Sequence, residues 1–141
     1  MDIFSQAVAD TATIHVKDAA GEPLYTDADR KIPVQIEIWG PGSDAAGIVE
    51  SRQTARSVKR LQDNDGRYTA VAPEDALKDA AEDLATLTRR FINFSYSPAG
   101  DAEGAELFQA VYLDRKLGFI KKQVQQAFAD WGKFKAASAA N

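Results

Sequence analysis

Cysteine and histidine, the side chains that most often act as nucleophiles, general bases or zinc ligands, are almost absent from this 141-residue chain. There is no cysteine and one histidine, His15, on the polar side of a predicted strand. A zinc site or a catalytic dyad would therefore need carboxylates alone. Acidic pairs such as Glu82 and Asp83, or Glu74 and Asp79, come with no base, cleft or ligand set. We interpret them as solvated faces of a helix.

Two glycine-containing segments match ligand-binding loops only in part. Residues 63–67, Asp-Asn-Asp-Gly-Arg, begin like a calcium loop, but the glycine arrives two positions too early, which predicts a plain surface loop. Residues 40–43, Gly-Pro-Gly-Ser, precede a helix whose N-terminus could bind an anion. Asp44 would repel that anion, so we interpret the segment as a structural turn. No nucleophile motif or phosphate-binding loop is present, and we expect neither an enzyme nor a bound cofactor or metal.

Charge and composition limit the class of protein. With 21 acidic and 17 basic residues the formal net charge is -4, which argues against general nucleic-acid binding. The first residues contain neither a basic segment nor a long apolar run, so we expect no signal peptide and no membrane-spanning segment. The lack of cysteine is compatible with the cytosol. The length predicts a single domain over residues 1–134, followed by a disordered tail over residues 135–141, which has no apolar anchor.

Two segments show the alternation of strands with one buried face. Apolar side chains occupy every second position of residues 11–17 and of residues 34–39, the spacing at which side chains share one side of a strand. We expect the two strands to pair as an antiparallel hairpin. Because an isolated hairpin is marginally stable in water, helices must cover its apolar face.

Four further segments carry apolar residues at spacings of three and four, which predicts amphipathic helices. The expected first helix covers residues 44–62, with Ser43 as N-cap, and the second covers residues 73–92. The third begins at residue 101 or 102 and runs to 112, and the fourth follows Asp114 as its N-cap and ends at Gly132. The apolar stripe of the first helix comprises Ile48, Ala55, Val58 and Leu61. The predicted fold class is therefore α+β, a small antiparallel β-hairpin packed against about four amphipathic helices.

Three places could contact a partner. Arg52, Arg56 and Arg60 share one face of the first helix, which could dock an acidic partner or phosphate; the alternative is a solvated surface that complements the helix dipole. Phe119 lies outside the apolar stripe of the fourth helix, and Trp39 points away from the buried face of its strand. We predict that these five residues are partner-binding.

An ordered series of segments resembles the tail assembly chaperones of long-tailed phages and of prophages in proteobacteria. The segments are residues 10–17, 21–25, 33–43, 107–112, 117–124 and 130–134. They include Gly-Glu-Pro-Leu at 21–24, Gly-Pro-Gly-Ser at 40–43 before an arginine-bearing helix, Leu-Gly-Phe at 117–119 and Trp-Gly at 131–132. Order and spacing agree over roughly residues 10–134, while residues 63–72 depart from the pattern.

The resemblance implies a non-enzymatic chaperone that binds the aggregation-prone tape measure protein in the host cytoplasm and is left out of the mature virion. It also implies that many relatives have a longer frameshifted form, whose added domain reaches the major tail protein. We expect a homo-oligomer with no nucleic-acid or membrane partner. Two alternatives stay open: a neck or tail-completion structural protein retained in the virion, and a nucleic-acid-binding regulator that uses the first helix.

Overall fold

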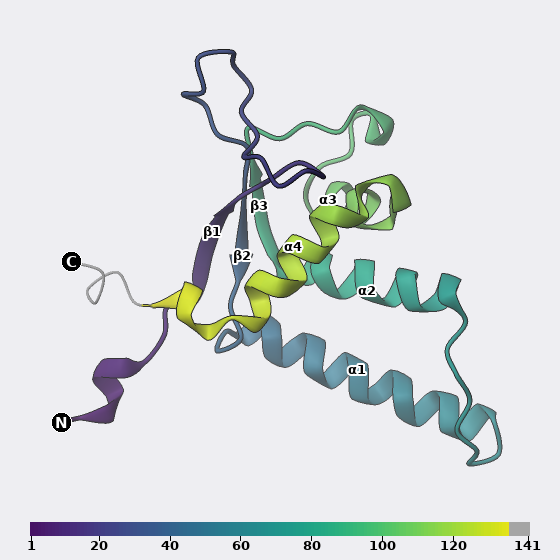
Figure 1. The fold of residues 1–141 in the computed structure, drawn as a ribbon. Helices are drawn as coiled ribbons and strands as arrows, with labels where there is room; N and C mark the ends of the chain where they lie inside the picture. The colour runs from purple at the N-terminus through teal and green to yellow at the C-terminus, as the bar shows by residue number, and fades with distance from the viewer. Residues whose placement is uncertain (136–141) are drawn as a thin grey trace.

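The two alternating segments form neighbouring strands. In a computed structural model, which describes residues 1–135, β1 (Thr11–His15) pairs antiparallel with β2 (Gln35–Trp39), and Ile14 lies opposite Ile36. A further strand, β3 (Thr88–Ile92), pairs with the other edge of β2, so the order across the sheet is β1-β2-β3 (Figure 1). Together with the helices, this antiparallel sheet confirms the predicted α+β class and the predicted hairpin.

The third strand corrects the range predicted for the second helix. Helix α2 (Pro73–Leu87) ends where the backbone of Thr88 becomes extended, at φ -91° and ψ 123°. The hydroxyl of Thr88 donates a hydrogen bond of 2.7 Å to the Leu84 carbonyl and so satisfies part of the helix end. Apolar residues keep the helical spacing through Phe91, so the sequence period does not separate strand from helix. Pairing with the edge of β2 decides the conformation instead.

The other helices lie close to their predicted ranges. Their bounds are α1 (Asp44–Asp63), α3 (Gly104–Leu113) and α4 (Gly118–Ala129). Ser43 caps α1 as predicted, with its Oγ accepting a hydrogen bond of 3.3 Å from the Ala46 amide. Asp114 caps a short 3-10 turn that leads into α4, rather than α4 itself. Helix α4 ends before the predicted Gly132, and a second 3-10 turn over Trp131–Phe134 follows.

The core lies between the sheet and the helices. Ile36 and Ile38 of β2 have no exposed surface, and they belong to one cluster with buried side chains from α2, α3 and α4. The largest fully buried side chains are Tyr112, Phe134, Ile36, Ile38, Val16, Val111 and Val124. Trp131, which the sequence places in the apolar stripe of the fourth helix, is 56% exposed, whereas Phe134 of the same turn is fully buried.

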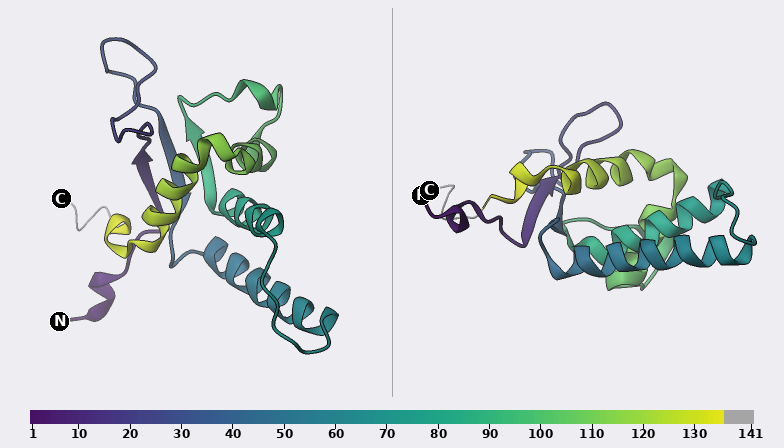
Figure 2. Two further views of the ribbon diagram at one scale, coloured as in Figure 1. Left: turned by 45° about the vertical axis from the view of Figure 1, so that its right-hand side comes forward. Right: turned by 90° about the horizontal axis from the view of Figure 1, so that it is seen from below.

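Helix α1 projects from the body along the lower edge of the molecule (Figures 1 and 2). Only Ala46 and Val49, near its N-terminus, are buried. The apolar stripe predicted for this helix is not part of the core, because Ile48, Val58 and Leu61 are all exposed. The remaining length of α1 contacts α2 through charged side chains, which are described below.

Segments from the two ends of the described chain close the fold. The Ala9 amide donates a hydrogen bond of 2.6 Å to the Phe134 carbonyl, and Val8 forms an isolated β-bridge with Lys135. Lys135 is thus ordered, which corrects the first residue of the predicted disordered tail. Residues 136–141, the rest of that predicted tail, lie outside the described residues.

Candidate partner-binding site

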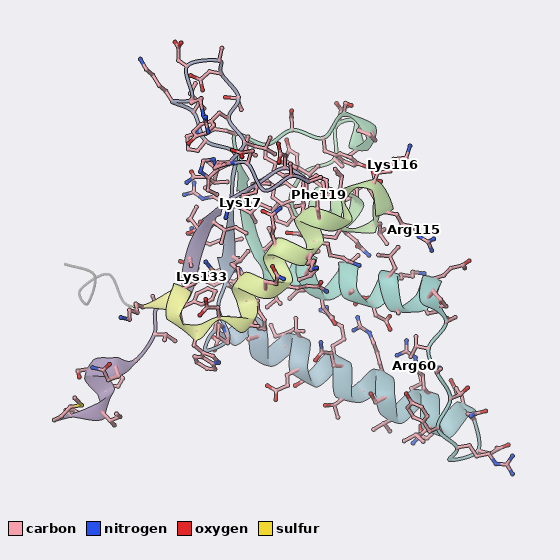
Figure 3. The ribbon with its side chains drawn as sticks, in the orientation of Figure 1. Lys17, Arg60, Arg115, Lys116, Phe119 and Lys133 are labelled. Atoms are coloured by element: carbon pink, nitrogen blue, oxygen red, sulfur yellow. The ribbon has the colours of Figure 1, made fainter. Side chains whose placement is uncertain are left out.

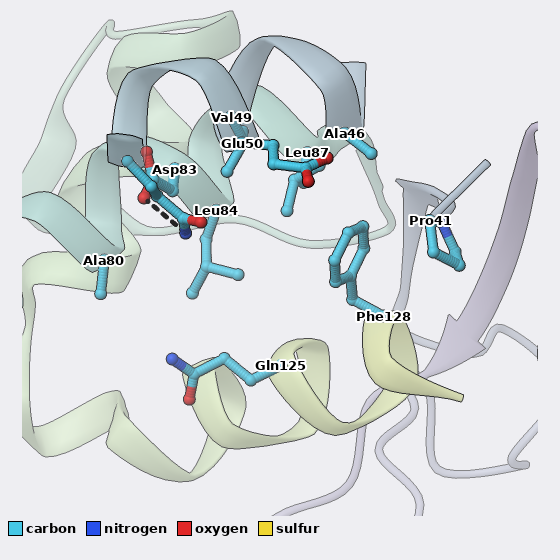
Figure 4. A pocket seen from close by; sticks show the side chains of 11 residues that line it. Pro41, Ala46, Val49, Glu50, Ala80, Asp83, Leu84, Leu87, Gln125 and Phe128 are labelled. Atoms are coloured by element: carbon cyan, nitrogen blue, oxygen red, sulfur yellow. Dashed lines mark hydrogen bonds between the residues drawn. The ribbon is translucent and has the colours of Figure 1, made fainter. Parts of the chain in front are cut away.

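A groove of about 590 Å³ opens between α1, α2 and α4. Apolar side chains from all three helices form its floor, the exposed Glu50, Gln53 and Gln125 stand at its edges, and the buried Asp83 borders it (Figure 4). The lining residues are Pro41, Ala46, Val49, Glu50, Gln53, Ala80, Asp83, Leu84, Leu87, Gln125 and Phe128. An apolar floor with a few polar groups at the rim is typical of a site that binds a partner side chain or helix.

Local sequence signals position the walls of this groove. The turn after β2 places Pro41 at one end, and the Ser43 cap starts α1 at that point. The Ser43 hydroxyl also donates a hydrogen bond of 2.6 Å to the Gly40 carbonyl, which fixes the direction in which α1 leaves the sheet. The opposite wall is α4, from which Gln125 and Phe128 contribute to the lining (Figure 4).

The predicted arginine surface of α1 lies against α2. Arg56 Nη1 donates hydrogen bonds of 3.0 and 2.8 Å to the two carboxylate oxygens of Asp83, and Arg52 Nη1 donates one of 3.2 Å to the same group. Arg60 pairs with Asp79. Hydrogen bonding to Asp83 raises the pKa of the Arg56 guanidinium above its ordinary value, so this side chain stays charged.

These contacts correct the interpretation of the acidic residues of α2. Asp83 is only 7% exposed and is not part of a solvated face. Glu82 lies 3.3 Å from Arg52 Nε and 3.2 Å from Arg56 Nη2, although the latter atom forms no hydrogen bond. Acidic side chains of α2 therefore already pair with the arginines that could have bound an acidic partner.

Trp39 lies on the outer face of the sheet, away from both the arginine surface and the groove. The guanidinium of Arg89 sits 5.7 Å from the centre of the Trp39 ring, a cation–π distance. A bulge between β2 and β3 lets Arg89 and Arg90 both reach the Glu37 carboxylate, at 2.7 and 2.8 Å. Burial favours a higher pKa for Glu37, but the two arginine hydrogen bonds outweigh it and lower the pKa.

Phe119, at the start of α4, lies in a third region (Figure 3). Its ring is half-buried and lines a second cavity, of about 410 Å³, together with Leu24 and Phe94. At this cavity Tyr96 donates a hydrogen bond of 2.7 Å to Asp114. The five predicted contact residues are therefore distributed over three separate surfaces, and their role in partner binding stays a prediction.

The groove itself was not predicted from the sequence. Leu84 and Leu87 are buried in the core and Phe128 packs against it, as their apolar stripes predict, and all three also line the groove. Spacing alone does not show whether the space in front of such a stripe is filled. The sequence signal nearest to the groove is the basic face of α1, whose Arg52 and Arg56 pair with Asp83 at the groove lining.

Residues 1–135 contain neither a metal-binding cluster nor a helix that could cross a membrane. In this range no cluster of three or more histidine, aspartate or glutamate side chains is placed to hold a metal ion. His15 Nε2 instead lies 2.7 Å from the Leu24 carbonyl, a contact that joins β1 to the following loop. None of the helices in the same range has the length and apolar character to cross a membrane.

No model of a known protein family, no curated protein and no solved structure matches this chain.

Proposed function

We propose that this chain is a non-enzymatic phage tail assembly chaperone that binds an amphipathic helix of the tape measure protein. The supporting observation is the groove between α1, α2 and α4, about 590 Å³ in volume, with an apolar floor and a polar rim. Grooves of this kind accept the apolar face of a helix through residues spaced by three and four positions. The ordered resemblance over residues 10–134 supplies the identity of the partner.

The proposal has several further parts, which follow from the resemblance. The chaperone keeps the tape measure protein soluble in the host cytoplasm until tail subunits polymerise, and it is absent from the mature virion. A longer frameshifted form connects it to the major tail protein. Binding of apolar segments through a groove needs no cofactor and no catalytic group.

A groove variant tests the proposal directly. The chain is co-expressed with the tape measure protein of the same phage, and the soluble, co-purified tape measure protein is quantified. Ala80, at the groove lining, is half-buried, and Ala80→Arg fills the groove with a charged side chain. We expect recovery of the tape measure protein to fall by roughly 10-fold or more, because a buried charge in an apolar groove is strongly unfavourable.

The matched control is Ala105→Arg, the same substitution at an exposed position of α3, which should leave recovery unchanged. A tape measure protein that stays insoluble and unbound with the original chain contradicts the proposal. Equal recovery of the tape measure protein with the two variants would show that the groove is not the binding site.

The alternative of a neck or tail-completion protein makes an opposite prediction for the particle. Mass spectrometry of purified virions should detect such a protein and should not detect a chaperone. The nucleic-acid-binding regulator loses its main support, since Arg52, Arg56 and Arg60 are paired with acidic groups of α2. If such binding occurs, its affinity should fall steeply with salt.

A further inference from the structure

A stripe along one face of α1, formed by Ile48, Ser51, Ala55 and Val58, is uncovered in the described part of the chain. It differs from the stripe predicted from the sequence, which includes Leu61 and lacks Ser51. Ile48 is 55% exposed and Val58 is 48% exposed. Ser51 and Ala55, which lie between them on the same face, are also exposed. Seen from below, α1 runs in front of the other elements (Figure 2). The stripe and the groove occupy roughly opposite sides of α1, since each residue turns the helix by about 100°.

The spacing of this stripe is the same from either end. Ile48, Ser51, Ala55 and Val58 are separated by three, four and three residues, with a larger apolar side chain at each end and a small one at each inner position. The centre of symmetry is position 53. Alternating spacings of three and four residues form the seam through which two helices pair in a coiled coil.

We propose that α1 pairs with α1 of a second copy of this chain, in antiparallel orientation about position 53. Ile48 of one copy then packs against Val58 of the other, and Ser51 packs against Ala55. The small inner residues allow the two helices to approach closely where they cross, and the larger outer residues fill the space on either side.

Charge favours the antiparallel orientation over the parallel one. Asp44 lies in the first turn of α1, and Lys59 lies near its end, where it also pairs with Asp63 of its own helix. Antiparallel pairing places Asp44 of one copy near Lys59 of the other at both ends. The helix dipoles also oppose each other favourably in this arrangement. Arg52, beside the centre, is already paired with Glu82 and Asp83 of its own chain. The repulsion between Arg52 and Arg52 of the second copy is therefore offset by these two carboxylates.

The pairing goes beyond the proposed function and does not rest on it, because it requires only copies of this chain. It leaves the groove on the other side of α1 open in both copies. A dimer with two open grooves would hold two helical segments at once, which strengthens attachment to one long partner through effective concentration.

Self-association of the purified chain alone provides the first test. Sedimentation equilibrium should show a dimer, and Ile48→Glu or Val58→Glu should weaken self-association by roughly 10-fold or more, since a charge would be buried in the seam. Phe4→Glu is the matched control, because Phe4 is 79% exposed in a segment far from α1. It should leave the dimer unchanged. Circular dichroism checks that each variant keeps its fold.

Cross-linking tests the orientation of the two helices. The native chain has no cysteine, so disulfides can form only between the introduced residues. Chains carrying Ile48→Cys and chains carrying Val58→Cys are oxidised separately and as a mixture. In the antiparallel pair, equal positions lie about 15 Å apart along the axis, so only the mixture should form disulfide-linked dimers. Dimers from either variant alone would overturn the antiparallel arrangement.

A wild-type chain that stays monomeric at high concentration would overturn the pairing itself. If Val58→Glu then lowers recovery of the tape measure protein, the stripe belongs to that partner instead. Neither result depends on Ala80→Arg, so failure of the pairing and failure of the groove proposal can be distinguished.

Discussion

Glu37 shows how one side chain can depend on its neighbours for its charge. Its carboxylate is buried on the outer face of the sheet, where Arg89 and Arg90 both donate hydrogen bonds to Oε1. The arginines bring its pKa below 4.5, the ordinary value for glutamate. A carboxyl group whose pKa is lowered by folding stabilises the folded state above its unfolded pKa, and this contribution is lost as the pH falls through the folded pKa.

We therefore expect Glu37→Gln to lower the free energy of unfolding by roughly 1 kcal/mol at neutral pH, because the exposed arginines are partly screened by solvent. The difference between the variant and the original chain should shrink as the pH falls below 4.5. Urea unfolding over a pH series measures this. Glu22→Gln, at an exposed loop position, serves as control. A difference that is independent of pH would show that the arginine pairs are not responsible.

Beyond the buried Ala46 and Val49 near the start of α1, charged contacts hold helices α1 and α2 together. Asp83 is central, since it accepts hydrogen bonds from Arg52, Gln53 and Arg56. Asp83→Ala should lower the free energy of unfolding by roughly 2–3 kcal/mol, because it leaves partly buried arginines without their nearest acceptor. Asp63→Ala removes an exposed pair with Lys59 and should cost at most about 0.5 kcal/mol. Equal losses for the two variants in urea unfolding would contradict this account.

The glycine after β2 is required by the close approach of another element. A Cβ atom on Gly40 would lie 2.6 Å from Phe134 Cδ1, so Gly40→Ala should lower the free energy of unfolding by roughly 1–3 kcal/mol through overpacking. Gly47→Ala, inside α1 with open space around it, should instead raise it by roughly 0.5–1 kcal/mol. Thermal unfolding distinguishes the two, and a Phe134→Leu change should recover part of the loss in Gly40→Ala. No recovery would exclude Phe134 as the cause.

Elements defined by local signals could be predicted, and elements defined by distant partners could not. The two alternating strands and the Ser43 cap follow from spacing and from one hydroxyl group. Strand β3 carries no glycine or proline that marks the end of α2, and its conformation depends on the edge of β2. The stripe of α1 has helical spacing whether or not it is covered, so its exposure depends on where α2 places its acidic residues.

For the whole molecule, the sequence predicts the class of fold but not the site. The groove is lined by residues of α1, α2 and α4, and the contacts that join two of these helices link residues about thirty positions apart, such as Arg52 and Asp83. The arginines were predicted as contacts because of their charge, Phe119 because it lies outside the stripe of its helix, and Trp39 because it lies off the buried face of its strand. None of these criteria detects a surface that is assembled from three helices.

During synthesis on the ribosome, β1 and β2 emerge long before Phe134, the fully buried side chain that packs beside Gly40. Until that residue appears, Ala9 lacks the backbone partner that it has in the finished fold. The nascent chain therefore presents Ile36 and Ile38 to the cell while its core is still open. A protein that is proposed to shield another chain from aggregation would thus itself need shielding, by the general folding machinery of the cell, until translation has passed Phe134.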